Sequence, residues 1–197
     1  MHEQVVRLTK LATELLDLSR LDAGQLEVAV DTVSLSETAR TVAAEFQAVA
    51  RTAAHPLEVD ADGAALAVGD EQRIAQIGRM LVENALVHTP AGTRVRVRTG
   101  SASGTAQLSV EDDGPGIASE HRTHVFDRFY RVDGTQASGS GLGLAIAREL
   151  AELMGGTLEL DSQPGRTVFT LTLPFSRQKT PGSRSRSDRA PSRAAPG

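Results

Sequence analysis

The sequence has no cysteine and no tryptophan among its 197 residues. The lack of cysteine excludes disulfide bonds, thiol nucleophiles and thiolate metal sites. Aromatic residues are scarce, with one tyrosine and five phenylalanines, so a core must consist mainly of aliphatic side chains. No apolar run approaches the ~20 residues of a membrane-spanning helix, and no signal segment opens the chain. We therefore expect a cytoplasmic protein, although a fragment of a membrane protein would look the same.

Charge is unevenly distributed along this chain, whose net charge is −4. Residues 176–197 contain six Lys or Arg, one Asp and no large apolar residue, a composition typical of a disordered basic tail. The first 175 residues are correspondingly acidic. This acidity argues against a general nucleic-acid-binding protein, since such a protein needs positive charge to meet the phosphate backbone.

Residues 1–25 have the pattern of one long helix with an apolar seam. Leu8, Leu11, Leu15 and Leu18 recur at alternating steps of three and four, and Gly24 is a suitable stop. Such a helix cannot bury its seam alone. It either packs on its own domain or forms half of a helical hairpin whose other half is missing.

Residues 26–175 combine strand and helix patterns. Ser34 begins a capping box, Asp70 can cap a second helix, and the Asp62-Gly63 pair indicates a turn. We expect an α+β fold: a two-layer sandwich with helices on one face of a mixed sheet, preceded by one long helix. The patterns predict strands at 26–33, 57–59, 64–68, 94–99, 106–112, 157–161 and 167–173, and helices at 34–53, 70–88, 119–128 and 142–154.

Four clusters of residues could carry chemistry. They are residues 83–90 at a helix end, 112–117 after a strand, 126–131, and 139–144 leading into a helix. Glycines in the last cluster let the backbone approach a ligand, and the free N–H groups of a helix start attract phosphate. This cluster is neither a dinucleotide-binding fingerprint, since no strand directly precedes it, nor a Walker A loop, since no Gly-Lys-Ser/Thr follows.

The other clusters each have an ordinary structural interpretation beside a functional one. Asp112 could accept a hydrogen bond from an amino group such as that of adenine, or could lie in an acidic turn. Asn84 offers a neutral oxygen suited to hydrated Mg²⁺, or is a surface residue. Phe126 and Phe129 could anchor a core or stack on a ligand. Each cluster alone therefore leaves the function open.

Taken together, the four clusters resemble the N, G1, F and G2 boxes of the histidine-kinase catalytic domain in order, spacing and placement. That domain belongs to the GHKL superfamily of gyrase, Hsp90, histidine kinase and MutL ATPases, with a Bergerat-type fold. The resemblance covers residues 26–175 and is especially close in the FDRFYRVD stretch at 126–133. The end of the first helix, LLDLSRLDAG, resembles the second helix of the dimerisation and phosphoacceptor hairpin.

The resemblance implies a domain that binds ATP and Mg²⁺. Asp112 would bind the adenine amino group, and Gly114 and Gly116 would shape the base pocket. Asn84 would ligate Mg²⁺, and Glu83 is either an acid/base group or a solvated helix carboxylate. The other nucleotide-binding residues implied by the resemblance are His88, Ile117, Phe126, Phe129, Arg131, Gly139, Ser140, Gly141, Leu142, Gly143 and Leu144.

The resemblance also implies a mobile lid at residues 131–138, but two positions depart from the family pattern. Met80 stands where an Asn is usual, and Val87 stands where a phosphate-contacting Lys or Arg is frequent. In gyrase-like relatives the position of Met80 carries the Glu that activates water. Met80 therefore argues against a hydrolytic ATPase, and Val87 indicates weaker nucleotide binding.

The phosphoacceptor motif of the family is absent, because none of the five histidines lies in its sequence context. We therefore interpret the chain as the C-terminal part of a sensor histidine kinase, a phosphotransferase that cannot phosphorylate itself in this form. The resemblance implies a response regulator as partner, a homodimer through the first helix if the hairpin is completed, and membrane attachment only through a missing upstream segment. The alternatives are a degenerate nucleotide-binding module and an anti-sigma-type serine kinase.

Overall fold

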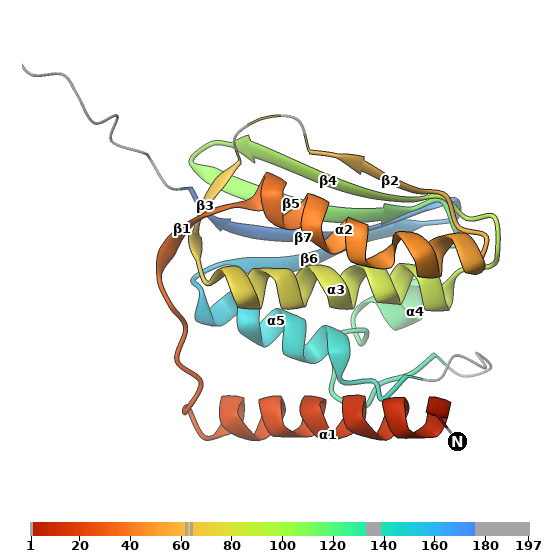
Figure 1. The fold of residues 1–197 in the computed structure, drawn as a ribbon, viewed down its shortest axis with the longest axis horizontal. Helices are drawn as coiled ribbons and strands as arrows, with labels where there is room; N and C mark the ends of the chain where they lie inside the picture. Colours follow the sequence, from red (N-terminus) through yellow and green to blue (C-terminus); the bar gives the residue numbers. More distant parts are fainter. Residues whose placement is uncertain (1, 62, 64, 133–138, 176–197) are drawn as a thin grey trace, which may run out of the picture.

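The computed structural model describes residues 2–61, 63, 65–132 and 139–175 (Figure 1). The expected tail at 176–197, most of the expected lid at 133–138, and Asp62 of the expected turn lie outside the described residues. The elements in chain order are α1 (His2–Asp22), β1 (Asp31–Ser34), α2 (Leu35–Thr52), β2 (Leu57–Asp60), β3 (Leu66–Gly69), α3 (Glu71–His88), β4 (Val95–Ala102), β5 (Thr105–Asp112), α4 (Ser119–Arg122), α5 (Gly143–Leu153), β6 (Thr157–Gln163) and β7 (Arg166–Pro174).

The main sheet has five strands in the order β2-β4-β5-β7-β6. Strand β2 runs parallel to β4 and the other neighbours are antiparallel, so the sheet is mixed. Strands β1 and β3 form a separate antiparallel pair. The two strands on either side of the expected Asp62-Gly63 turn therefore belong to different sheets and do not pair with each other.

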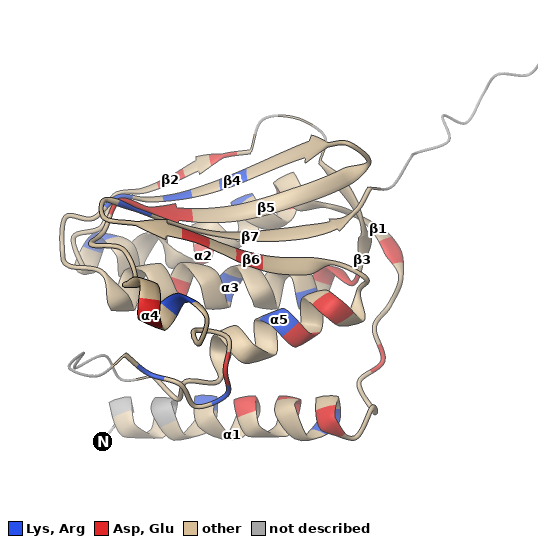
Figure 2. Ribbon diagram, turned by 180° about the vertical axis from the view of Figure 1, so that it is seen from behind, with Lys and Arg blue, Asp and Glu red and all other residues tan. Residues whose placement is uncertain are grey.

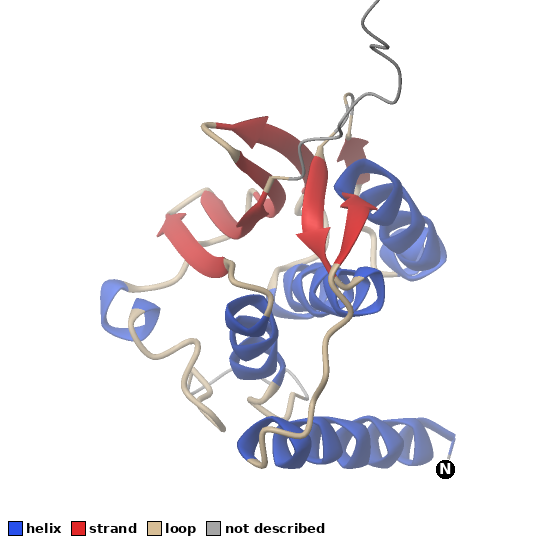
Figure 3. Ribbon diagram, turned by 90° about the vertical axis from the view of Figure 1, so that its left-hand side faces the viewer, coloured by secondary structure: helices blue, strands red, loops and turns tan. Residues whose placement is uncertain are grey.

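Helices α2, α3 and α5 cover one face of the main sheet (Figures 1 and 3). The core between these layers is aliphatic, as the composition requires: Ile77, Leu81 and Leu150 from the helices are fully buried, as are Leu108 and Leu171 from the strands. Burial of such side chains contributes about 1.5–3 kcal/mol each. The expected two-layer α+β sandwich is confirmed.

The other face of the sheet carries ion pairs across neighbouring strands. Arg96 on β4 lies between Glu58 on β2 and Glu111 on β5, at 3.2 and 3.0 Å. Arg98 also pairs with Glu111, at 2.9 Å. Val95 and Val97 alternate with these arginines and are buried on the helix side. The alternation fixes which face of β4 meets the core.

Helix α1 forms a further layer, next to α5 (Figures 1 and 3). It packs on its own domain, which is one of the two arrangements that the sequence left open. The face that it turns inward is nevertheless polar as well as apolar, since Glu14, Asp17 and Leu18 are buried. Leu8 and Leu15 are 65% and 45% exposed, so much of the leucine seam lies at the surface.

The predicted strand at 26–33 is wrong for residues 26–30, because β1 begins only at Asp31. The preceding residues connect α1 to the body without a pairing strand. Leu26 is buried and Val28 is half-buried, whereas Glu27 and Ala29 are exposed, an alternation that resembles that of a strand. The Ala29 N–H instead donates to the Asp70 carboxylate at 3.0 Å.

The predicted helix at 119–128 is also too long, since α4 ends at Arg122. Beyond it the chain makes successive turns, with His124 N–H donating to the His121 carbonyl and Asp127 N–H to the His124 carbonyl. Phe126 packs edge-on against Phe169 of the sheet, with ring centroids 6.1 Å apart. This tertiary contact directs the segment away from a helical path.

Among the described residues, no helix combines the length and apolar character that crossing a bilayer requires.

Asp70 caps α3 and gives a pH-dependent contribution to stability. Its carboxylate accepts N–H bonds from Gln72 and Arg73 as well as from Ala29. Burial alone would raise the pKa of Asp70, but these backbone donors outweigh it and the pKa is lowered. A lowered pKa means that the contribution is present above the unfolded carboxyl pKa of about 3.9 and is lost as the pH falls through the folded value.

We therefore expect Asp70→Ala to lower the free energy of unfolding by about 1 kcal/mol at neutral pH, and by progressively less below about pH 4. Urea denaturation across pH measures the difference. Ser34→Ala is the matched control, since Ser34 caps α2 with a hydroxyl that does not titrate in this range. If the loss of unfolding free energy in Asp70→Ala is as independent of pH as the loss in Ser34→Ala, the assignment is contradicted.

Candidate nucleotide-binding site

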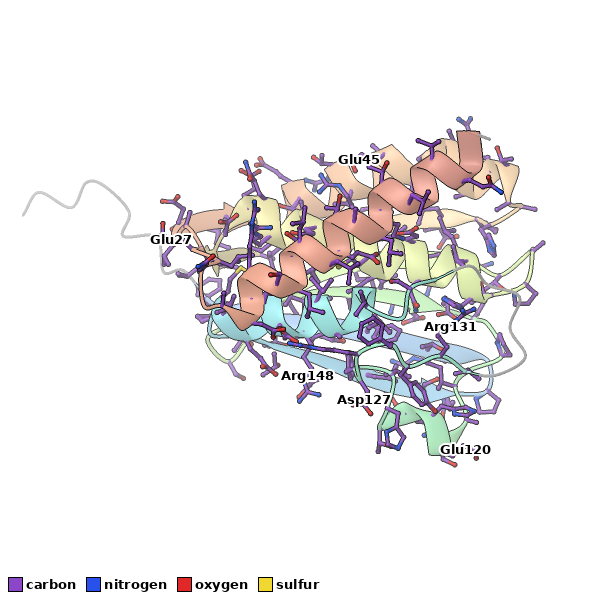
Figure 4. The ribbon with its side chains drawn as sticks, turned by 90° about the horizontal axis from the view of Figure 1, so that it is seen from below. Glu27, Glu45, Glu120, Asp127, Arg131 and Arg148 are labelled. Atoms are coloured by element: carbon purple, nitrogen blue, oxygen red, sulfur yellow. The ribbon has the colours of Figure 1, made fainter. Side chains whose placement is uncertain are left out.

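The four clusters meet around one cavity of about 470 Å³. It lies between the C-terminal half of α3, the loop after β5, α4, and the segment leading into α5, with α1 as a further wall. Figure 4 shows α1 crossing in front of α3 and α5, with Arg131 on a loop beside them. Of the expected site residues, the cavity is lined by Glu83, Asn84, His88, Gly116, Ile117, Arg131, Gly139, Ser140, Gly141, Gly143 and Leu144.

Helix α3 supplies the N-box residues from one side of its last turns. Asn84 lines the cavity with a neutral amide, next to Glu83, whose side chain is 39% exposed. Burial lowers the pKa of His88, and the Arg131 guanidinium lowers it further against the opposing effect of Glu83. His88 is therefore biased toward its neutral form. Met80 and Val87 add apolar surface where the family pattern would place polar groups.

Asp112 ends β5 immediately before the cavity loop and is 6% exposed. One of its oxygens accepts the Gly114 N–H at 3.0 Å. Burial raises the pKa of Asp112, as do the Asp113 and Glu111 carboxylates, while the bond from Gly114 lowers it. Asp112 does not itself line the cavity. Its role in recognising adenine stays a prediction.

The glycines expected at the site meet two different structural requirements. A Cβ on Gly116, which has φ +79°, would lie 2.5 Å from the Gln163 carbonyl oxygen. A Cβ on Gly141, at φ +74°, would lie 2.8 Å from the Phe129 backbone. Gly139 and Gly143 face open space instead. The first pair permits close backbone packing, and the second pair leaves backbone accessible to a ligand.

The F and G2 clusters are joined through their backbones. Phe129 has φ 64° and its N–H donates to the Gly141 carbonyl at 2.9 Å. Phe129 is 61% exposed, whereas Phe126 packs against the sheet. The side chain of Leu142 is buried in the core, and its N–H donates to Ser140 Oγ at 3.1 Å. Neither phenylalanine lines the cavity.

Several contributors escaped the sequence analysis, among them Ser162 and Lys10. Ser162 on β6 accepts the Ile117 N–H at 2.9 Å and bonds to Thr167 Oγ1, so it supports the cavity loop from behind. Lys10 lines the cavity from α1 and pairs with Glu83. A serine in a strand and a lysine on a helix carry no motif, and no signal in the sequence relates either one to residues so far along the chain.

The donor set suits a metal ion that arrives with a nucleotide. In the part of the chain that the structure describes, no group of three or more His, Asp or Glu side chains is arranged to hold a metal. Asn84 supplies one neutral oxygen at the cavity wall. Mg²⁺ keeps several waters and phosphate oxygens in such sites, so one protein ligand fits this ion.

Comparison with known proteins assigns the domain. A family model described as histidine kinase-, DNA gyrase B-, and HSP90-like ATPase matches residues 69–177. The chain belongs to this ATPase family. It is 36% identical over 176 residues to the sensor protein IrlS of Burkholderia pseudomallei, covering 87% of this chain and 38% of that protein. It thus spans about two fifths of the length of this relative and of the sensor histidine kinase YkoH of Bacillus subtilis.

Solved structures of family members agree with this assignment. The histidine kinase AdeS of Acinetobacter baumannii aligns with a TM-score of 0.74 at 26% identity, covering 89% of this chain and 82% of that chain. The full-length protein ShkA, in complex with AMPPNP, aligns with a TM-score of 0.75 at 27% identity, covering 86% of this chain and 36% of that chain. The resemblance to sensor histidine kinases that the sequence suggested is confirmed.

The two structural requirements for glycine can be tested by comparing alanine substitutions. We expect Gly116→Ala to lower the free energy of unfolding by about 2 kcal/mol or more, because its methyl group meets a fixed backbone carbonyl at positive φ. Gly139→Ala, with nothing within 4 Å of its Cβ position, should stay within about 0.5 kcal/mol of the wild type. Chemical denaturation measures both. Equal effects of the two substitutions would refute the distinction.

Proposed function

We propose that the chain is the catalytic part of a two-component sensor histidine kinase, which binds ATP–Mg²⁺ and transfers the γ-phosphoryl group to a histidine. The observation that carries the proposal is the meeting of all four clusters at one cavity, with Asn84, Gly139 and Gly143 open to it. The volume, about 470 Å³, falls within the range of small-molecule sites.

In the proposed complex, Asp112 accepts a hydrogen bond from the adenine amino group. The buried position of this carboxyl favours such a specific contact, because an unpaired buried oxygen is costly. Backbone N–H groups between Gly139 and Leu144, at the start of α5, face the phosphates. Asn84 would hold Mg²⁺, which when bound would neutralise charge that develops on the phosphate oxygens.

Transfer then depends on positioning rather than on a covalent enzyme intermediate. The acceptor imidazole nitrogen attacks the γ-phosphorus while the bond to the β,γ-bridging oxygen breaks, and ADP leaves. Glu83 lies beside Asn84 at the cavity and is the candidate to accept the imidazole proton. We include residues 131–138 as a lid, of which the structure describes Arg131 and Val132, both at the cavity.

The wider assignment also belongs to the proposal. Residues 1–25 correspond to the second helix of the phosphoacceptor hairpin, residues 26–175 to the catalytic domain, and 176–197 to a tail. The exposed seam residues Leu8 and Leu15 support pairing of α1 with a further helix, and so a homodimer once the hairpin is complete. A response regulator receives the phosphoryl group, and the whole kinase is anchored in the membrane with this part in the cytoplasm.

A second candidate is a nucleotide-binding module without transferase activity. It is favoured by Met80 and Val87, which line the cavity with apolar atoms beside Asn84.

Adenine recognition is tested with Asp112→Asn. The substitution replaces one of the two carboxylate oxygens with an NH2 group, so either the Gly114 N–H or the adenine amino group would face a donor instead of an acceptor. We expect ADP–Mg²⁺ affinity, measured by calorimetry, to fall about tenfold. Asp113→Asn is the matched control: Asp113 is adjacent and exposed, and accepts the Arg94 N–H. If Asp112→Asn binds ADP as tightly as the control, adenine recognition by Asp112 is excluded.

Transfer is tested with a separate acceptor-hairpin protein and radiolabelled ATP–Mg²⁺. We expect acid-labile label on the acceptor histidine, none on this chain alone, and loss of transfer in Asn84→Ala. ATP binding without transfer to any acceptor hairpin would favour the binding module. Acid-stable label on serine of a partner would favour a serine kinase instead.

A further inference from the structure

Helix α1 lies outside the matched family region, yet two of its side chains, Lys10 and Glu14, line the cavity. The helix is held there by contacts along its length. Ser140 donates its hydroxyl proton to the Glu14 carboxylate, and Gln76 Nε2 donates to Asp17 at 2.7 Å. The position of Lys10 relative to the cavity is therefore set by the fold.

The far end of α1 is anchored to the F cluster. Arg128 donates to the Asp22 carboxylate at 2.6 and 3.0 Å and also pairs with Glu149 of α5, at 2.8 Å. The hydrogen bond from Arg128 lowers the pKa of Asp22. Figure 2 shows charged residues at several turns of α1, and a loop next to this helix that also carries basic residues.

The balance of charged side chains at the cavity shows what a lysine from α1 would add for binding a polyphosphate. Of the described residues that line it, Lys10 and Arg131 are the Lys and Arg side chains, against the carboxylates of Glu83 and Glu14. Helix α3 adds no positive charge to the cavity near neutral pH, because the lowered pKa of His88 favours its neutral imidazole. A polyphosphate would therefore meet as many carboxylates as strong cations, and without Lys10 the carboxylates would be in excess.

Lys10 lies between the two segments to which the proposed function assigns Mg²⁺ and the phosphates. Its ammonium group pairs with Glu83, the neighbour of Asn84, and lies 3.9 Å from Glu14, whose other oxygen holds Ser140 in the phosphate-binding segment. Two carboxylates thus keep the ammonium between α3 and the glycine-rich segment. A more highly charged phosphate group is the stronger partner for a compact ammonium ion.

We propose that Lys10 is a phosphate-binding residue of the nucleotide site, contributed by α1 from outside the ATPase domain. This rests on the proposed function, because it assigns a ligand to that same cavity. Its ligand is the β- or γ-phosphate of the nucleotide. By linkage, phosphate binding and docking of α1 stabilise each other.

The test compares Lys10→Gln with wild type in the full chain, using calorimetry with adenosine, ADP–Mg²⁺ and a non-hydrolysable ATP analogue with Mg²⁺. We expect adenosine affinity to change by less than about twofold, and affinity for the ATP analogue to fall about tenfold, the size expected for a charge-assisted hydrogen bond. Lys10→Arg should restore most of the loss. Arg20→Gln, an exposed cation on the same helix, is the matched control and should change none of the three affinities.

A double variant separates direct binding from neutralisation of Glu83. If Lys10 only compensates the Glu83 carboxylate, Lys10→Gln combined with Glu83→Gln regains wild-type affinity, and the proposal is overturned. If Lys10 binds phosphate, the double variant remains weaker than Glu83→Gln alone.

The binding measurements have further outcomes that would overturn the assignment of Lys10. Unchanged or tighter binding of the ATP analogue by Lys10→Gln overturns the proposal, as does an equal loss for adenosine, and the proposed function stands in each case. Absence of binding by the wild type to all three ligands overturns both.

Discussion

The candidate site depends on the close backbone contact between the loop after β5 and the turn joining β6 to β7. The Gly165 N–H donates to the Gly114 carbonyl at 3.0 Å, and Ser162 accepts the Ile117 N–H. Gly116 lies so near the Gln163 carbonyl that no side chain fits. The pairing of Asp112 with Thr167 brings these two segments together at one end of the sheet. Sheet register thus shapes one wall of the cavity.

Sequence patterns predicted the elements that are specified locally. Helix α3 begins after Asp70 and ends at His88, as its capping residue and the following Thr-Pro indicate. The segments at 26–33 and 119–128 were predicted less well because tertiary contacts decide them. Around Leu26 an alternating pattern has no strand beside it, and around Phe126 an aromatic contact with the sheet replaces helical hydrogen bonds.

The site was predictable to the extent that it consists of motifs. The clusters identified the residues of α3 and of the glycine-rich segment, because those residue types at those spacings are specific together. Periodicity could not show that α1 turns Glu14 and Asp17 inward while Leu8 stays exposed. It also could not show that Lys10 reaches Glu83, 73 positions further along the chain. Such contacts depend on how separate layers are assembled, which a local pattern does not encode.

The ion pairs on the helix-free face of the sheet have a consequence for misfolding. If β4 slipped by one residue against its neighbours, Arg96 and Arg98 would enter the aliphatic core while Val95 and Val97 became solvated. Burial of two unpaired guanidinium groups is prohibitive, so this misaligned sheet is not a competing state. The same penalty holds Asp112 opposite Val95 at the strand end. Arginines remote from the cavity therefore favour the native register of β4, and with it the geometry of the cavity wall.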